Sequence, residues 1–271
     1  MKDDFSRSQK QNILNSKILS KLSGKAAKTA EIILYDEEIE VLQKYANVVS
    51  IKRFGFNDHG RVHMRIVALN ALIMAELLKD AGIKLNLEKE YTGTFEESQI
   101  VLLLASFLHD IGMTITREKH EYTGAILAIP IIDRIVNEIY KDDIEKKVMI
   151  RSMTLECILG HMSTQKTRSL ESGLILIADG CDMEKGRAEK PMKYNKEPQV
   201  GDIHKYSAAS IESVKIEKGS RLPIKITVEM LSSVGFFQIE EVLFTKINSS
   251  SIKPYIELYA HVKGEEMKCY L

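Results

Sequence analysis

Residues 96–112 read EESQIVLLLASFLHDIG. The part of this stretch before the His-Asp pair is apolar nearly all round, which predicts a helix that is buried on every side. Gly112 is expected to end the helix, because glycine commonly follows the last helical residue. His109 and Asp110 are therefore expected at the end of a buried, central helix.

Further helices are expected on both sides of this one. Thr94 and Glu97 have the spacing of a capping box, which marks the start of the central helix. In the first part of the chain, apolar residues recur at three- and four-residue steps, as amphipathic helices require. Three more helices are expected later, from about residue 118 through the 130s, over 143–160 and over 170–181.

The pattern changes after Asp179. A stretch rich in Gly, Pro and charge is expected to be a long loop. Apolar residues then alternate with polar ones, which predicts a hairpin, a helix over about 235–247 and a last strand from Ile256 to Val262. The predicted fold is mainly α: a helical domain at 1–188, followed by a smaller α+β domain of β-β-α-β order at 203–271.

Composition limits the classes of function. The 271 residues are 44% hydrophobic and 28% charged, which is typical of a globular protein. Lys and Arg total 38 and Asp and Glu total 38, so no overall positive field favours nucleic acid as a partner. The longest apolar run is too short to span a membrane, and the start of the chain is too charged for a signal peptide. Three widely separated cysteines without C-x-x-C spacing favour a reducing cytoplasm.

Histidine is the most informative residue type. Five of the seven histidines fall in the helical part, several beside carboxylates or at helix ends. A His-Asp pair alone is more often a cap or a surface feature. At the end of a buried helix, however, the carboxylate of Asp110 must be hydrogen-bonded or bound to a metal, because an unpaired buried charge is costly. Imidazole and carboxylate together suit Mn, Fe, Ni or Zn.

Two more helix ends carry residues of the metal-ligand type, His63 before an apolar helix and Asp179 after one. The order of these residues resembles the pattern of the HD superfamily of metal-dependent phosphohydrolases. That pattern is a histidine, then an adjacent His-Asp pair, then a distant aspartate, which correspond here to His63, His109, Asp110 and Asp179. The sequence HDIGM resembles the HDIG variant of this superfamily, and the sequence ADGCD resembles the segment around the superfamily's final aspartate. The resemblance covers about residues 55–187.

His120 and His161 extend this resemblance. They fall where HD proteins with two metals carry extra histidines, so the resemblance implies two divalent ions (Mn, Fe, Ni, Zn or Mg) with Asp110 between them. The alternative is structural, with His120 on a helix surface and His161 favoured by a helix dipole. The chain lacks the GYP-type text of the HD-GYP class, so specificity for a cyclic dinucleotide does not follow.

Other residues have expected roles around this site. His59 competes with His63 for the first ligand position, but the spacing into the following helix favours His63. His59 is expected either to support a ligand residue or to face the substrate, and with His109 and Asp110 it completes the expected catalytic set. Asp182 is expected to accept a hydrogen bond from a ligand histidine. Residues expected to bind substrate are Lys185, Arg187 and His204, although a solvated loop explains the first two equally well and a linker explains the third.

The expected activity is hydrolysis of a nucleotide or another phosphate ester by a metal-activated water. No Ser-hydrolase elbow, phosphate-binding P-loop or dinucleotide-binding turn competes with this interpretation. The alternative is a regulatory or binding module that holds metal and nucleotide without turnover while the C-terminal domain engages a partner. The sequence leaves self-association open.

Overall fold

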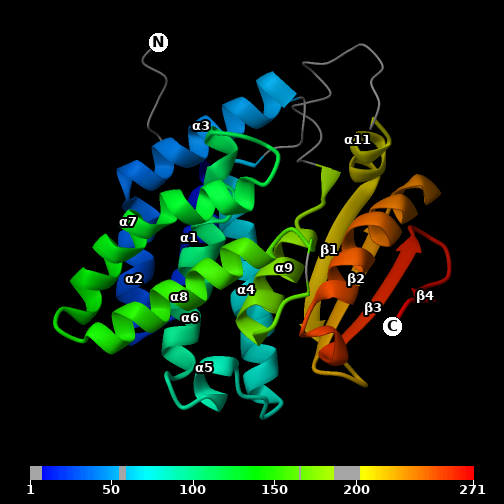
Figure 1. The fold of residues 1–271 in the computed structure, drawn as a ribbon. Coiled ribbons are helices and arrows are strands. Elements are labelled where there is room, and N and C mark those ends of the chain that lie inside the picture. Colours follow the sequence, from blue (N-terminus) through cyan, green and yellow to red (C-terminus); the bar gives the residue numbers. More distant parts are fainter. Residues whose placement is uncertain (1–7, 55–58, 165, 186–201) are drawn as a thin grey trace.

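The computed structural model describes residues 8–54, 59–164, 166–185 and 202–271. The first part is helical, as predicted (Figure 1). Its elements are α1 (Gln9–Leu19), α2 (Gly24–Tyr35), α3 (Glu37–Phe54), α4 (Arg61–Asp80), α5 (Asn86–Lys89), α6 (Phe95–Leu108), the 3-10 turn η1 (Ile111–Thr114), α7 (His120–Tyr140), α8 (Ile144–Gly160) and α9 (Leu170–Gly180).

Helix α6 is the centre of the helical part. Every residue from Glu97 to Leu108 is buried, and α2, α4, α8 and α9 all pack against this helix. The predicted capping box is confirmed: the Thr94 backbone N–H donates to Glu97 at 2.8 Å, and the Thr94 hydroxyl accepts from the N–H of Glu96. The residues that follow α6 are therefore delivered to the interior of the molecule.

The C-terminal part is a four-stranded mixed sheet with a helical crossover. β1 pairs antiparallel with β2, β2 parallel with β3, and β3 antiparallel with β4. The elements are α11 (Asp202–Ala209), β1 (Ile211–Lys218), β2 (Ile224–Met230), η3 (Ser233–Gly235), η4 (Gln238–Leu243), α12 (Phe244–Ser249), η5 (Lys253–Tyr255), β3 (Ile256–Val262) and β4 (Lys268–Cys269).

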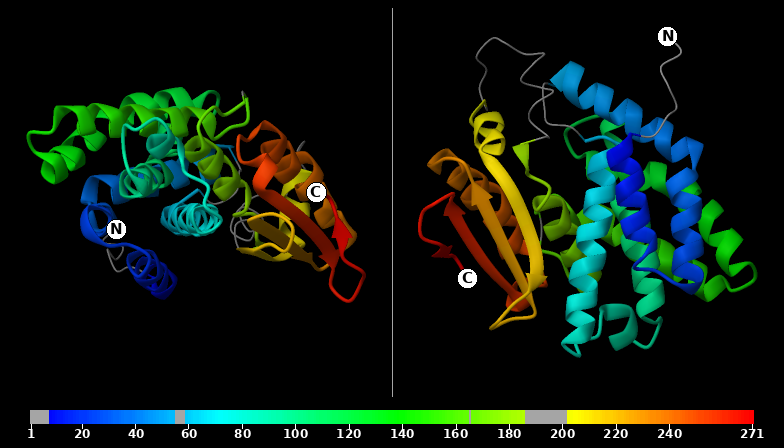
Figure 2. Two further views of the ribbon diagram at one scale, coloured as in Figure 1. Left: turned by 90° about the horizontal axis from the view of Figure 1, so that it is seen from below. Right: turned by 180° about the vertical axis from the view of Figure 1, so that it is seen from behind.

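One face of the sheet is buried and the other is partly exposed. Along β2 the buried side chains are Ile224, Ile226, Val228 and Met230, and those between them are half-buried. Helix α4 contacts β1 and β2, while η4 and α12 lie against α9 (Figure 2). Because β2 and β3 run parallel, the chain must cross over between them, and η4–α12 is that connection.

The predicted order of helices, hairpin, helix and strand is confirmed, with local differences. The helix expected over 235–247 is divided into the 3-10 turn η3, the π-helix η4 and the α-helix α12, which a period of three to four residues cannot distinguish. Strand β4 is too short to show an alternating pattern. Gly112 does not end α6, which stops at Leu108; the glycine lies inside η1. The loop expected before residue 202 lies outside the described residues.

The two parts share buried surface. One connected set of buried apolar side chains includes Leu72 and Leu174 from the helices and Ile226 and Leu258 from the sheet. The division into domains at 1–188 and 203–271 stays a prediction.

Candidate metal centre

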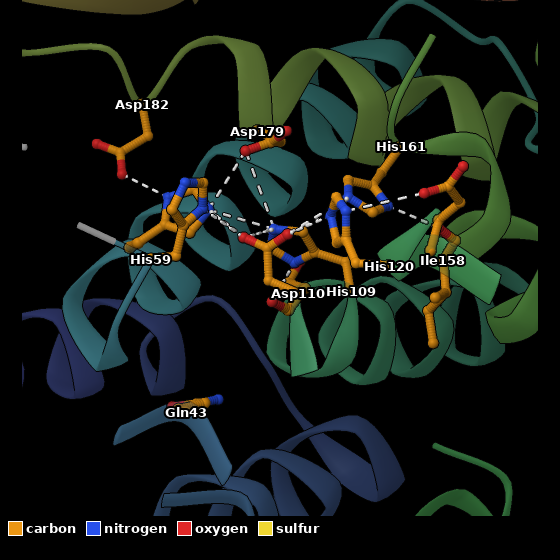
Figure 3. A network of polar contacts seen from close by, with 12 residues as sticks. Gln43, His59, His109, Asp110, His120, Ile158, His161, Asp179 and Asp182 are labelled. Atoms are coloured by element: carbon orange, nitrogen blue, oxygen red, sulfur yellow. Dashed lines mark hydrogen bonds and ion pairs between the residues drawn. The ribbon is translucent and has the colours of Figure 1, made fainter. Parts of the chain in front are cut away.

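The ends of five helices bring the candidate ligands together (Figure 3). The α6 end supplies two of them because the chain turns directly into η1. The six side chains are His63 in the first turn of α4, His109 and Asp110 after α6, His120 at the start of α7, His161 after α8 and Asp179 at the end of α9.

Four of these residues form the first ligand group: His63, His109, Asp110 and Asp179. The Nε2 atoms of His63 and His109 are 3.2 Å apart. Asp179 Oδ1 lies 3.3 Å from Nε2 of His63 and 3.9 Å from Nε2 of His109. Asp110 Oδ2 lies 3.5 and 3.3 Å from the same two nitrogens. Both aspartate oxygens therefore lie near the same two ring nitrogens, and His63, His109 and Asp179 form a set of mutually close ligand atoms.

The second ligand group consists of Asp110, His120 and His161. The Nε2 atoms of His120 and His161 are 3.1 Å apart, and Asp110 Oδ1 lies 3.0 and 3.4 Å from them. All three side chains are buried. The structure thus places His120 and His161 inside the molecule, and the alternative of a surface His120 is wrong.

Asp110 belongs to both groups through different oxygen atoms. Burial by itself raises the pKa of this carboxyl, but His109 and His59 outweigh it and hold the pKa well below its usual value. Asp110 is therefore ionised at neutral pH. A carboxylate that presents one oxygen to each of two nitrogen groups has the geometry of a bridging ligand.

In three of the four candidate ligand histidines, the partner of Nδ1, the ring nitrogen that points away from the site, determines which nitrogen carries the proton. His63 Nδ1 lies 2.6 Å from Asp182 Oδ2, as predicted for Asp182, and His109 Nδ1 lies 2.9 Å from the Ser106 carbonyl oxygen. His161 Nδ1 lies 2.6 Å from the Ile158 carbonyl oxygen. Each acceptor favours a proton on Nδ1 and leaves Nε2 with its lone pair. At His120, Nδ1 is 3.0 Å from both the carbonyl and the guanidinium of Arg117, so its tautomer is not fixed.

The inward ring nitrogens suit a positive charge placed between them. Burial lowers the pKa of His161 to about 4, so this ring is neutral at pH 7. Lone pairs about 3 Å apart beside carboxylates repel one another unless a cation lies between them. The two ligand groups could therefore hold metal ions, and the nitrogen and oxygen donors are those of a metal site.

Gly112 allows α7 to reach the site. A Cβ atom at this position would collide with the carbonyl oxygen of His120 and lie 2.5 Å from the backbone nitrogen of Gly124. The first turn of α7 therefore packs directly on the backbone of η1. This close approach places His120 beside Asp110, which explains the glycine two residues after the His-Asp pair.

Lys246 of α12 is a site residue that the sequence did not indicate. Its Nζ atom lies 2.5 Å from Asp179 Oδ2 and 2.8 Å from the carbonyl oxygen of His161. Burial by itself raises the pKa of Asp179, but Lys246 and His63 outweigh it and hold the pKa well below its usual value. Glycines in α9 are the sequence feature connected with this contact: at Gly180, a Cβ would lie 2.9 Å from the Lys246 side chain.

His59 lies beside the first ligand group. Its Nδ1 atom is 2.8 Å from Asp110 Oδ2, and its backbone N–H donates to Asn47 of α3 at 2.9 Å. With 17% of its side chain exposed, it is the most accessible ring of the cluster. His59, His63 and Asp110 also form a third convergent set of ligand atoms, so the structure leaves His59 close to both of its expected roles.

The three residues expected to bind substrate are placed as follows. Lys185 pairs with Glu212 of β1 at 2.7 Å. The ring of His204 packs on Phe237, with 5.0 Å between ring centres. Arg187 lies outside the described residues. His204 belongs to none of the convergent sets of ligand atoms in the described part.

Two other expectations concern the chain as a whole. All three cysteines are free, with Cys157 and Cys181 buried and Cys269 exposed. Within the described residues, no helix is long and apolar enough to cross a membrane.

The fold and site define a mainly helical protein with a buried His/Asp centre that could hold metal, joined to a mixed sheet. The chain is 37% identical over 248 residues to Uncharacterized protein MJ1020 of Methanocaldococcus jannaschii, covering 92% of this chain and 93% of that protein. The chain belongs to the same family as this archaeal protein. No family model matches the chain, and no solved structure matches it.

Proposed function

We propose that the protein is a metal-dependent phosphohydrolase that acts on a nucleotide or another phosphate ester, as its resemblance to the HD superfamily implies. The observation that supports this most directly is Asp110, whose two oxygens face separate groups of imidazole nitrogens. A carboxylate between two metal positions is suited to in-line displacement at phosphorus, because one position can orient water while the other holds substrate.

The donor set favours some ions over others. Each ligand group supplies two imidazole nitrogens, which suit Mn, Fe, Ni or Zn better than Mg, since Mg prefers oxygen ligands. When bound, such ions lower the pKa of water toward neutrality and neutralise charge on phosphate oxygens. His63, His109, Asp110 and Asp179 would hold one ion, and Asp110, His120 and His161 the other.

The remaining residues would position groups and move protons. Asp182 and the two backbone carbonyls keep the ligand rings turned inward. His59 is held through Nδ1 by Asp110 at the accessible side of the cluster, so its Nε2 would give a proton to the leaving oxygen. Lys185, after release from Glu212, together with Arg187 and His204, would bind the substrate phosphate.

A second candidate is the binding module without turnover. It is favoured by Lys246, which joins the C-terminal part directly to Asp179 and so would couple the site to a partner on the sheet. In that case, metal and nucleotide would bind normally and no phosphate would be released.

The test is hydrolysis by protein loaded with Mn²⁺. Substrates would be a chromogenic phosphomonoester, a chromogenic phosphodiester and a panel of nucleotides and cyclic nucleotides. We expect turnover of at least one substrate, its loss on chelation and in Asp110→Ala, and its retention in Asp80→Ala, which removes an exposed carboxylate at the end of α4. A metal-loaded protein that binds a nucleotide without cleaving any substrate would support the binding module instead.

A further inference from the structure

Lys246 connects the C-terminal part to both ligand groups. Its Nζ atom contacts Asp179 of the first group and the backbone carbonyl of His161 of the second. Only 12% of its side chain is exposed. A lysine loses much rotamer freedom when it is held in this way, so the two acceptors and the negative charge must compensate.

Two glycines of α9 allow α12 to come this close. Gly173 and Gly180 are seven residues apart, which places them on the same face of the helix. A Cβ at Gly173 would lie 2.8 Å from Ser250 Oγ, and a Cβ at Gly180 would lie 2.9 Å from Lys246 and 3.3 Å from Leu243. The crossover segment therefore rests on a face of α9 that has no side chains at these two positions.

Hydrogen bonds fix the crossover segment at the other end of α9. The N–H of Thr167 donates to the Ser249 carbonyl at 3.0 Å, and the Ser251 hydroxyl donates to the Ser169 carbonyl at 2.6 Å. The Ser250 hydroxyl donates to the Gly173 carbonyl at 3.2 Å. Contacts at both ends of α9 thus set the position of α12 and of Lys246.

The two oxygens of Asp179 have different partners as a result. Oδ2 accepts from Lys246, while Oδ1 is the atom that lies 3.3 Å from His63 Nε2. We propose that Lys246 is a positioning residue of the metal centre: it occupies Oδ2, so that Asp179 offers a single oxygen to the ion in the first ligand group. The C-terminal part thereby completes the metal centre. This inference rests on the metal site of the proposed function but not on its reaction.

Charge and geometry predict different effects of removing Lys246. An ammonium group repels a nearby divalent cation, so its loss does not weaken metal binding through charge. Its loss does release Oδ2, which can then turn toward the first ligand group and make Asp179 a two-oxygen ligand. The number of coordinating atoms, rather than metal affinity, therefore reports the positioning role.

The experiment measures the visible absorption of Co²⁺, which weakens as the coordination number rises. The parent is the full chain with His120→Ala and His161→Ala, so that only the first ligand group remains. The test variants of this parent carry Lys246→Met, Lys246→Gln or Lys246→Arg. The control variant carries Lys253→Met, which removes an exposed lysine beyond α12. Circular dichroism and the thermal midpoint check that each variant is folded.

We expect a weaker and shifted Co²⁺ spectrum in Lys246→Met and Lys246→Gln, with parental spectra in Lys246→Arg and in the control. Parental spectra in the folded Met and Gln variants would overturn the proposal. Failure of the parent to bind Co²⁺ would overturn it together with the metal centre. The proposed reaction alone would be overturned if the Co²⁺ spectrum of the parent depends on Lys246 as expected but the wild-type protein hydrolyses no phosphate ester.

Discussion

Asp110 lies in the interior with an ionised carboxylate, and four histidines approach it through Nε2 at 3.0 to 3.5 Å. Replacing Asp110 would remove the negative charge that all of these histidines contact, whereas replacing one histidine changes the contacts of only one of its two oxygens. The separate roles of its two oxygens can therefore be tested by changing the rings around one of them.

The double variant with His120→Ala and His161→Ala is expected to lower the metal content by about one ion per chain, because it removes both imidazole nitrogens of the second ligand group. The first ligand group keeps its four residues and should stay loaded. Elemental analysis after equal loading with Mn²⁺ and removal of loose metal measures this. His261→Ala, on the outer face of the sheet beside Glu229, is the matched control.

An unchanged metal content in the double variant would refute the second position. It would leave a site for one ion with two structural histidines.

The sequence predicted these six candidate ligands from helix ends for His63, His109, Asp110 and Asp179, and from the resemblance to two-metal HD proteins for His120 and His161. Lys246 could not be found in this way, because a single lysine in an amphipathic helix is most often exposed to solvent and nothing in the local pattern marks it as different. Its role depends on how α12 packs on α9, which is a contact between distant parts of the chain. Gly173 and Gly180 were the only local trace of that contact.

At the scale of elements, two glycines control how closely helices approach the site. Gly112→Ala is expected to lower the free energy of unfolding by at least about 2 kcal/mol, because its Cβ would meet backbone atoms of α7 that cannot move independently. Gly180→Ala meets the side chain of Lys246 rather than backbone and gains helix propensity in return, so its loss of stability should be smaller than that of Gly112→Ala. Urea denaturation compares the two variants; equal losses would contradict this account of Gly112.

The start of α6 gives stability that depends on pH. Burial by itself would raise the pKa of Glu97, but hydrogen bonds from the Thr94 hydroxyl and N–H and from Tyr140 outweigh it and lower the pKa. Burial and Glu97 raise the pKa of Tyr140, so its phenol stays protonated and donates. The ionised Glu97 therefore stabilises the folded state.

Because the folded pKa of Glu97 is below the unfolded value near 4.5, its stabilisation is complete above that value and is lost as the pH falls through the folded pKa. We expect Glu97→Gln to be less stable than the wild type from pH 7 down to about 5, and the difference to shrink below about 4.5. Urea midpoints across this range measure it. A difference that stays constant down to pH 3 would show that the charge of Glu97 is not responsible.

At the scale of the molecule, the question is how far the C-terminal part depends on the helices. The alternating strands and the charged segment before residue 203 predicted a separate domain. The structure adds a shared apolar core and a crossover segment bonded along α9. The sequence could show the strands, since alternation is local, but not their docking, which depends on surfaces that only the fold brings together.

Cleavage of the chain between the two parts distinguishes a docked domain from a loosely tethered one. A protease site introduced between residues 188 and 201 would allow the cut without changing any described residue. We expect the two fragments to remain together at the size of the intact chain, because the buried face of the sheet and the Lys246 contact with Asp179 persist without the connection. Size-exclusion chromatography after cleavage, with metal content measured on the same peak, provides the readout. Fragments that separate under native conditions, with the helical fragment keeping its full metal content, would show that the sheet is dispensable for the metal centre.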